Sequence, residues 1–94
     1  NLNVNQDVNI MNRLAWLYAK KRLKLDLGIN LMKLVNKAES KNPKYIDTMS
    51  ELLYAKGDVV EAVKAIREAI RLDPKKSYYR QQIWKFKNIP YDQN

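Results

Sequence analysis

The chain has 94 residues, a formal net charge of +8, and neither cysteine nor histidine. The missing cysteine excludes disulfide bonds, thiol nucleophiles and iron–sulfur clusters, and the missing histidine removes the commonest general base and transition-metal ligand. Glycine is rare and no apolar stretch approaches the roughly 18 residues of a membrane span, so we expect one small helical domain that does not span a membrane.

The first predicted helix runs from residue 8 to residue 21. Residues 1–7 are polar and lack periodicity, so we expect a flexible arm before the helix. From residue 8 onward, apolar side chains recur at helical spacing and predict one buried stripe. That stripe consists of Val8, Met11, Leu14 or Ala15, and Tyr18.

The second predicted helix runs from Asp26, as its N-cap, to Ser40. The loop before it begins at Lys20 and is expected to cover Leu23 and Leu25. Apolar residues occupy more than one face of this helix, which is typical of a helix buried between two neighbours. Its main stripe is Leu27, Leu31, Leu34 and Ala38, widened by Ile29, Met32 and Val35.

The third predicted helix starts at Pro43 and ends at Lys56. Asn42 is a typical N-cap residue, and proline is favoured at the first helical position. Gly57 then supplies the left-handed backbone conformation that commonly ends a helix. The residues expected to face inward are Ile46, Met49, Leu52 and Leu53.

The fourth predicted helix, over residues 59–72, has the most regular pattern in the chain. Asp58 is expected to cap its first N–H groups, and Glu61 to complete a capping box. The small side chains of Ala62 and Ala69 lie on nearly one face of the helix. They are expected to let a neighbouring helix approach closely, with a large apolar residue between them.

A fifth helix is predicted over residues 78–87. Pro74 ends the fourth helix, and Ser77 is expected to cap the new one. Its buried side is expected to consist of Tyr79, Ile83 and Phe86. Trp84 lies on the opposite side, and residues 88–94 are expected to form a flexible tail.

The stretch from Asp58 to Pro74 resembles the second helix of a tetratricopeptide (TPR) repeat. The positions that carry the resemblance are Ala62, Ile66, Ala69 and Pro74. An internal repeat supports it, at a separation close to the family's period of about 34 residues. The recurring residues are Leu14, Ala15 and Tyr18, and then Met49, Ser50 and Leu53. The first repeat is degenerate in its second helix, where Leu31 replaces a small residue.

The resemblance covers roughly residues 8–76 and implies a fold. It predicts an all-α domain over residues 8–87, with two antiparallel helical hairpins and a C-terminal capping helix in a short right-handed solenoid. Two repeats are marginal for a stacked core, so we also expect self-association or contact with a neighbouring domain.

The resemblance also implies a function. Proteins of this family bind a partner protein or peptide in a concave groove lined by the first helix of each repeat. We therefore expect a non-enzymatic adaptor or scaffold module, without catalytic, cofactor-binding or metal-binding residues. The predicted groove residues are Asn12, Trp16, Asp47, Glu51, Tyr54, Gln81 and Lys85.

Several groove residues have a structural interpretation as well. Trp16 is either a binding aromatic in the groove or a structural residue packed under the loop after its helix or against the N-terminal arm. Asp47 is explained by a favourable charge in the first turn of its helix, and Glu51 by an ion pair. Their one-turn spacing also occurs in catalytic carboxylate pairs, but two hairpins rarely form the deep pocket that such a site needs.

Positive charge is concentrated in the C-terminal third, in a basic patch of Arg71, Lys75, Lys76 and Arg80. Solubility, or docking to an acidic partner protein, explains this charge. A nucleic-acid-binding domain is disfavoured because the charge is not clearly interleaved with aromatic residues on one surface. A further alternative is structural, namely an interface segment permanently docked in a larger assembly or parent chain.

Overall fold

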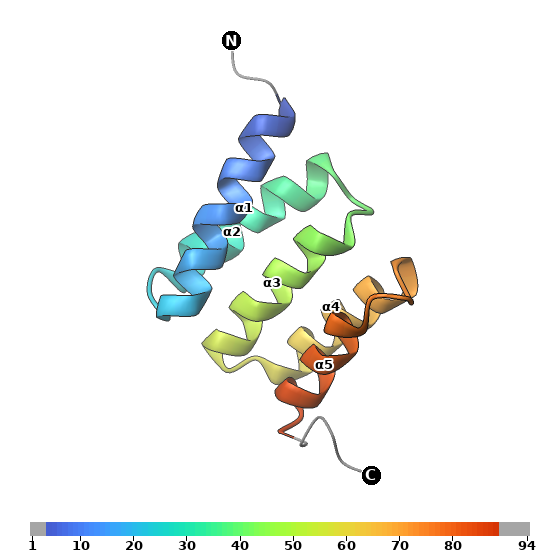
Figure 1. Ribbon diagram of the computed structural model, residues 1–94. Helices are drawn as coiled ribbons and strands as arrows, with labels where there is room; N and C mark the ends of the chain where they lie inside the picture. The colour runs from blue at the N-terminus through green and yellow to red at the C-terminus, as the bar shows by residue number, and fades with distance from the viewer. Residues whose placement is uncertain (1–3, 89–94) are drawn as a thin grey trace.

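The computed structural model describes residues 4–88, which form five α-helices. They are α1 (Val4–Lys21), α2 (Leu25–Ala38), α3 (Pro43–Lys56), α4 (Val59–Leu72) and α5 (Ser77–Phe86) (Figure 1). No strand occurs within residues 4–88, which confirms the all-α prediction. Residues 1–3 of the predicted arm and residues 89–94 of the predicted tail lie outside the described range.

The helix α3 lies in the middle of the molecule (Figure 1). α1 and α2 pack against each other and against one side of α3, whereas α4 packs against the other side and carries α5. Two apolar cores result, the first among α1, α2 and α3, and the second among α3, α4 and α5. Across residues 4–88, none of these helices combines the length and the apolar character that a membrane crossing requires.

The helix α1 is longer than predicted. It begins at Val4 rather than at residue 8, so the end of the predicted arm is helical. Its buried side contains Ala15 and Ala19, whose small side chains let α1 approach its neighbours closely. Leu14, the alternative to Ala15 in the predicted stripe, is exposed.

The beginning of α2 differs from the prediction. The helix starts at Leu25, so Asp26 is already helical and does not cap it. The residue before the helix, Lys24, has a left-handed φ of 51° and provides no side-chain cap. The connection from α1 is only residues 22–24, and the expected burial of Leu23 is wrong, because 45% of its surface is exposed.

The buried face of α2 also differs from the prediction. It consists of Gly28, Met32 and Val35. The predicted stripe instead turns outward, with Leu27, Leu34 and Ala38 exposed and Leu31 half-buried. A Cβ atom added to Gly28 would lie 2.7 Å from Cδ2 of Leu52 on α3. Glycine is therefore what allows α2 to approach α3 this closely, and that contact selects the buried face.

The junction between α3 and α4 forms as predicted, with one change. Gly57 has a φ of 96°, and its N–H donates to the carbonyl oxygen of Tyr54. The N–H of Asp58 donates to the carbonyl oxygen of Leu53, which completes a Schellman ending. The Asp58 carboxylate accepts from the N–H of Glu61 at 3.4 Å. The reciprocal half of the capping box is absent from this junction, because the Asp58 N–H is already bonded.

The other helix starts give a mixed result. Asn42 caps α3 as predicted, since its Oδ1 accepts from the N–H of Lys44 at 3.0 Å. Ser77 is the first residue of α5 and not its cap, and the cap position is held by Lys76 without a side-chain hydrogen bond.

The packing of α4 and α5 matches the sequence pattern. Ala62, Ile66 and Ala69 are completely buried, as expected for a helix that approaches its neighbours through small residues. On α5, Tyr79 and Phe86 are buried against this face of α4. These contacts fix the rotation of α5 and so decide which of its side chains reach α3.

Candidate functional site

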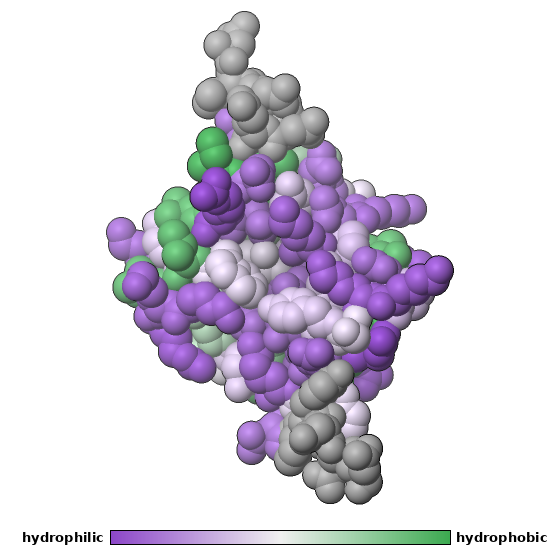
Figure 2. Space-filling view, viewed as in Figure 1, coloured by the Kyte–Doolittle hydropathy of each residue, from purple (hydrophilic) through white to green (hydrophobic). Residues whose placement is uncertain are grey.

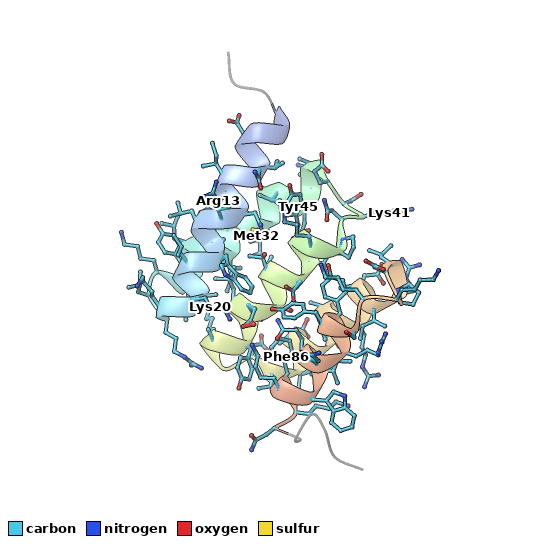
Figure 3. The ribbon with its side chains drawn as sticks, in the orientation of Figure 1. Arg13, Lys20, Met32, Lys41, Tyr45 and Phe86 are labelled. Atoms are coloured by element: carbon cyan, nitrogen blue, oxygen red, sulfur yellow. The ribbon has the colours of Figure 1, made fainter. Side chains whose placement is uncertain are left out.

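A pocket of about 460 Å³ lies between α1, α3 and α5. It is lined by Asn12, Arg13, Trp16 and Leu17 of α1, by Lys44, Asp47 and Thr48 of α3, and by Tyr78 of α5. Figure 3 shows the arrangement of these helices, with the labelled Lys20 on α1 and Phe86 on α5 at either side of α3. Helical spacing explains the lining, because the residues from α1 lie one turn apart, as do those from α3.

Two aromatic residues, Trp16 and Tyr78, line the pocket. Both are half-buried, so each side chain is partly held by the protein and partly accessible. Nζ of Lys20 lies 4.4 Å from the centroid of the Trp16 ring, which is a cation–π contact. Trp16 therefore belongs to the pocket wall.

Asp47 is a buried carboxylate in the wall of the pocket. Its Oδ1 accepts from Nε2 of Gln82 at 2.9 Å. Burial raises the pKa of Asp47 from the usual 3.8 to about 6, against the lowering effect of that hydrogen bond, and the nearby charge of Glu51 raises it further. Asp47 lies beyond the first turn of α3, so its interpretation as a first-turn charge is wrong.

Asn12 is a second costly polar group in this pocket. The residue is only 5% exposed, yet its Oδ1 has no hydrogen-bond partner among the residues that the structure describes. Leaving a buried acceptor unsatisfied costs about 1–3 kcal/mol.

An ion-pair network extends from the pocket along α3. Oε2 of Glu51 accepts from Nε2 of Gln82 at 2.8 Å and from Nζ of Lys85, and lies 3.7 Å from Nζ of Lys20. Burial alone would raise the pKa of Glu51, but the hydrogen bonds from Lys85 and Gln82 outweigh it and lower that pKa. The predicted ion pair of Glu51 is thus confirmed, and it links α1, α3 and α5. We call the pocket and this network together the groove.

The predicted groove residues fall into three groups. Asn12, Trp16 and Asp47 line the pocket, and Glu51 and Lys85 belong to the network. Tyr54 instead packs on Phe86, with ring centroids 4.8 Å apart, in the second core. Gln81 is exposed, and it is its neighbour Gln82 that bonds the two carboxylates.

Sequence reasoning missed Gln82 and Tyr78, as well as Arg13, Lys44 and Thr48. A signal for two of these residues was present. Gln82 is three residues after the buried Tyr79 and four before the buried Phe86, so it lies on the same side of α5. Tyr78 is one turn before Gln82. For the residues of α1 and α3, no local pattern indicated which polar side chains would face α5.

The basic patch of Arg71, Lys75, Lys76 and Arg80 is exposed, but part of its charge is engaged. Arg71 pairs with Glu68, and Arg80 donates to the carbonyl oxygen of Pro74. The Tyr79 ring beside Lys76 is 3% exposed, so it offers no face on which a nucleic-acid base could stack.

Comparison with protein-family models, curated protein sequences and solved structures gave no match. The case for a function therefore rests on the geometry of the groove and of the outer helix surfaces.

Proposed function

We propose that this chain is a non-enzymatic protein-interaction module that binds a peptide segment of a partner protein in the groove. In this proposal, α1 with α2 and α3 with α4 are two TPR-like hairpins, capped by α5 in a short right-handed solenoid. The order of the helices, their pairwise packing and the buried Ala62 and Ala69 support it.

The observation that carries the proposal is the set of unfavourably buried polar groups in one pocket. Asp47 has a raised pKa, and Asn12 has an acceptor oxygen without a partner in the described chain. Strained electrostatics of this kind concentrate at functional sites, and a pocket that joins apolar walls to a few convergent polar groups is typical of a binding site. Both groups would be satisfied by hydrogen-bond donors of a bound segment.

The aromatic walls supply the second element of a binding site. Trp and Tyr contribute a disproportionate share of binding energy at protein interfaces, because they bury much area at little entropic cost. Trp16 and Tyr78 face one pocket from opposite helices, and Arg13 and Lys44 line the same pocket. This combination favours a segment that places an apolar or aromatic anchor between the rings and an acidic residue near the two cations.

A non-catalytic role is supported by the state of the two carboxylates. Asp47 and Glu51 both accept from the same amide of Gln82, and Glu51 also holds two lysines. The pair is therefore tied into the contacts that hold α5 against α3.

A selection experiment tests the proposal. Random peptides displayed on phage would be selected on the wild-type chain and counter-selected on Trp16→Ala, with Trp84→Ala as the matched control. We expect enriched peptides that bind wild type and Trp84→Ala but not Trp16→Ala, and that shift the amide resonances of Asn12 and Thr48. Peptides that shift only resonances of α2 or α4 would contradict the proposal.

A second candidate function, a structural segment permanently docked in an assembly, is favoured by one observation. Large apolar side chains on α1 and α2 are exposed, with Ile10 at 58% and Leu34 at 59%. Size-exclusion chromatography separates the two candidates. A soluble monomer supports peptide binding in the groove, whereas obligate association supports the structural role.

A further inference from the structure

A contiguous apolar surface covers the outer side of the α1–α2 pair. On α1 it contains Ile10, Leu14 and Leu17, which are 58%, 39% and 51% exposed. On α2 it contains Leu27 and Leu34, at 46% and 59%, with the half-buried Leu31 between them. We call these six residues the leucine face. In Figure 2, hydrophobic side chains gather at the left edge of the molecule, where Figure 1 places α1 and α2.

The spacing and register of the two helices bring these residues together. Within each helix the three residues follow each other at steps of four and three, so they form one stripe. The register is fixed by Tyr18 of α1, whose Cβ lies 3.6 Å from the position of a Cβ on Gly28 of α2. Because the chain reverses between the helices, moving back along α1 from Tyr18 corresponds to moving forward along α2. The stripes therefore run side by side.

The leucine face points away from the rest of the domain. The buried residues of α1 and α2 face α3. On α1, Asn12 lines the pocket together with residues of α3, and on α2, Gly28 contacts Leu52 of α3. The exposed stripe of α1 lies opposite its buried side, and the stripe of α2 lies about 100° around the helix from Gly28, Met32 and Val35. Monomeric proteins seldom leave an apolar surface of this extent uncovered, since such patches mark interaction sites.

The charged residues near the leucine face indicate which kind of partner can bind it. Exposed basic side chains lie on the same two helices and in the turn between them, namely Arg13, Lys21, Lys24, Lys33 and Lys37. None of these five forms an ion pair with another residue in the described part of the chain. The acidic residues of α1 and α2 are Asp7, at one end of the face, and Asp26, which is paired with Lys56.

A second copy of this chain fits such a surface poorly. It would bring two sets of unpaired lysines and arginines to one interface, where like charges oppose association. A partner whose apolar surface is flanked by acidic residues would instead pair with these lysines and arginines. Two parallel ridges of leucine separated by a helix–helix groove accept a third helix through its own i, i+4, i+7 stripe.

We propose that the leucine face docks an amphipathic helix of a partner protein whose apolar stripe is flanked by aspartate and glutamate. The apolar stripe supplies the affinity, the acidic margin sets the orientation, and the cations of the chain itself disfavour a second copy. This site differs from the groove, which opens between α1, α3 and α5, and the two sites share only Arg13 and Leu17 of α1.

The probe for this proposal is a pair of synthetic helical peptides with the same leucine stripe. One carries glutamate at the flanking positions and the other carries lysine. Fluorescence anisotropy with the whole chain should show the glutamate peptide binding about tenfold more tightly or better at low salt, with the difference shrinking as salt rises.

Matched variants locate the site. The double variant Ile10→Ser/Leu34→Ser, which touches no residue of the groove, should weaken binding of the glutamate peptide by about tenfold or more, while Val60→Ser, at an exposed position on α4, should change it by less than about twofold. Circular dichroism melts should show both variants folded, since the substituted side chains are exposed.

Three results would overturn the proposal. Equal affinity for the two peptides would show that acidic flanking residues are not recognised. Binding that the double variant leaves unchanged would show that the peptide binds at another site. A chain that sediments as a dimer, and becomes monomeric in Ile10→Ser/Leu34→Ser, would show that a second copy occupies the leucine face.

Discussion

Replacing Asp47 with asparagine should stabilise the protein at neutral pH. Asparagine has nearly the same shape, and its Oδ1 can still accept the hydrogen bond that Gln82 donates. What it removes is the charge that burial disfavours. The substitution therefore separates the cost of the buried carboxylate from the contacts that the side chain makes.

The magnitude follows from the pKa of Asp47. Burial raises it from the usual 3.8 to about 6, which is a shift of roughly 2 pKa units and is worth about 3 kcal/mol at most. Between these two values the folded protein binds more protons than the unfolded chain. The free energy of unfolding should therefore decrease as pH rises from about 4 to about 6 and stay at the lower level above that pH.

Urea denaturation between pH 4 and pH 8 measures this effect. Wild type should lose stability across the range from about 4 to 6, whereas Asp47→Asn should not, so the variant becomes the more stable protein at pH 7. Glu51 acts in a different window, because its pKa is lowered and its contribution is lost only as pH falls below 4.5. Glu51→Gln should keep a loss of stability between pH 4 and 6 but make it smaller, because the charge of Glu51 contributes to the raised pKa of Asp47. A wild-type stability that is flat or rises between pH 4 and 6 would refute the reasoning.

Three further predictions concern packing and capping, each measured by urea denaturation against wild type. Gly28→Ala should lower the free energy of unfolding by about 1–2 kcal/mol despite the better helix propensity of alanine, because the new Cβ atom forces the completely buried Leu52 side chain to shift within the first core; a stabilised variant would show that Leu52 can shift without cost. Ala62→Leu should cost about 1–3 kcal/mol by overpacking the second core, and unchanged stability would mean that α4 does not pack there. Asp58→Ala should cost about 0.5–1 kcal/mol, at the low end for a cap because its hydrogen bond is 3.4 Å long, whereas Asp58→Asn should cost little.

The ends of α3 and α4 could be predicted because short local signals determine them. Asn42 and Pro43 start α3, and Gly57 and Asp58 separate it from α4, each through backbone geometry that a few neighbouring residues decide. The buried face of α4 was equally accessible, since its small residues recur on one side of an otherwise polar helix.

The buried face of α2 could not be predicted by periodicity. Apolar residues surround that helix, so several stripes are equally compatible with the sequence. The contact between Gly28 and Leu52 decides among them, and it depends on a residue in a different helix. The outward stripe then becomes an exposed surface in place of a core.

The groove was predicted in part for a similar reason. Trp16 and Asp47 line one pocket, as expected from the alignment of the first helices of the two predicted hairpins. The burial of Asp47 and Glu51 was missed, since polar residues on α3 become buried only when α1 and α5 both cover them. The choice between Gln81 and Gln82 depended on the rotation of α5, which the buried Tyr79 fixes.

The central claim is that the groove binds a peptide segment through Trp16. The most direct test is isothermal titration of one selected peptide against wild type, Trp16→Ala and the matched Trp84→Ala, with thermal melts of the same samples. We expect Trp16→Ala to weaken binding by about 2 kcal/mol or more while its melting temperature changes little, and Trp84→Ala to bind like wild type. A Trp16→Ala protein that is strongly destabilised, yet whose folded fraction binds the peptide normally, would contradict it.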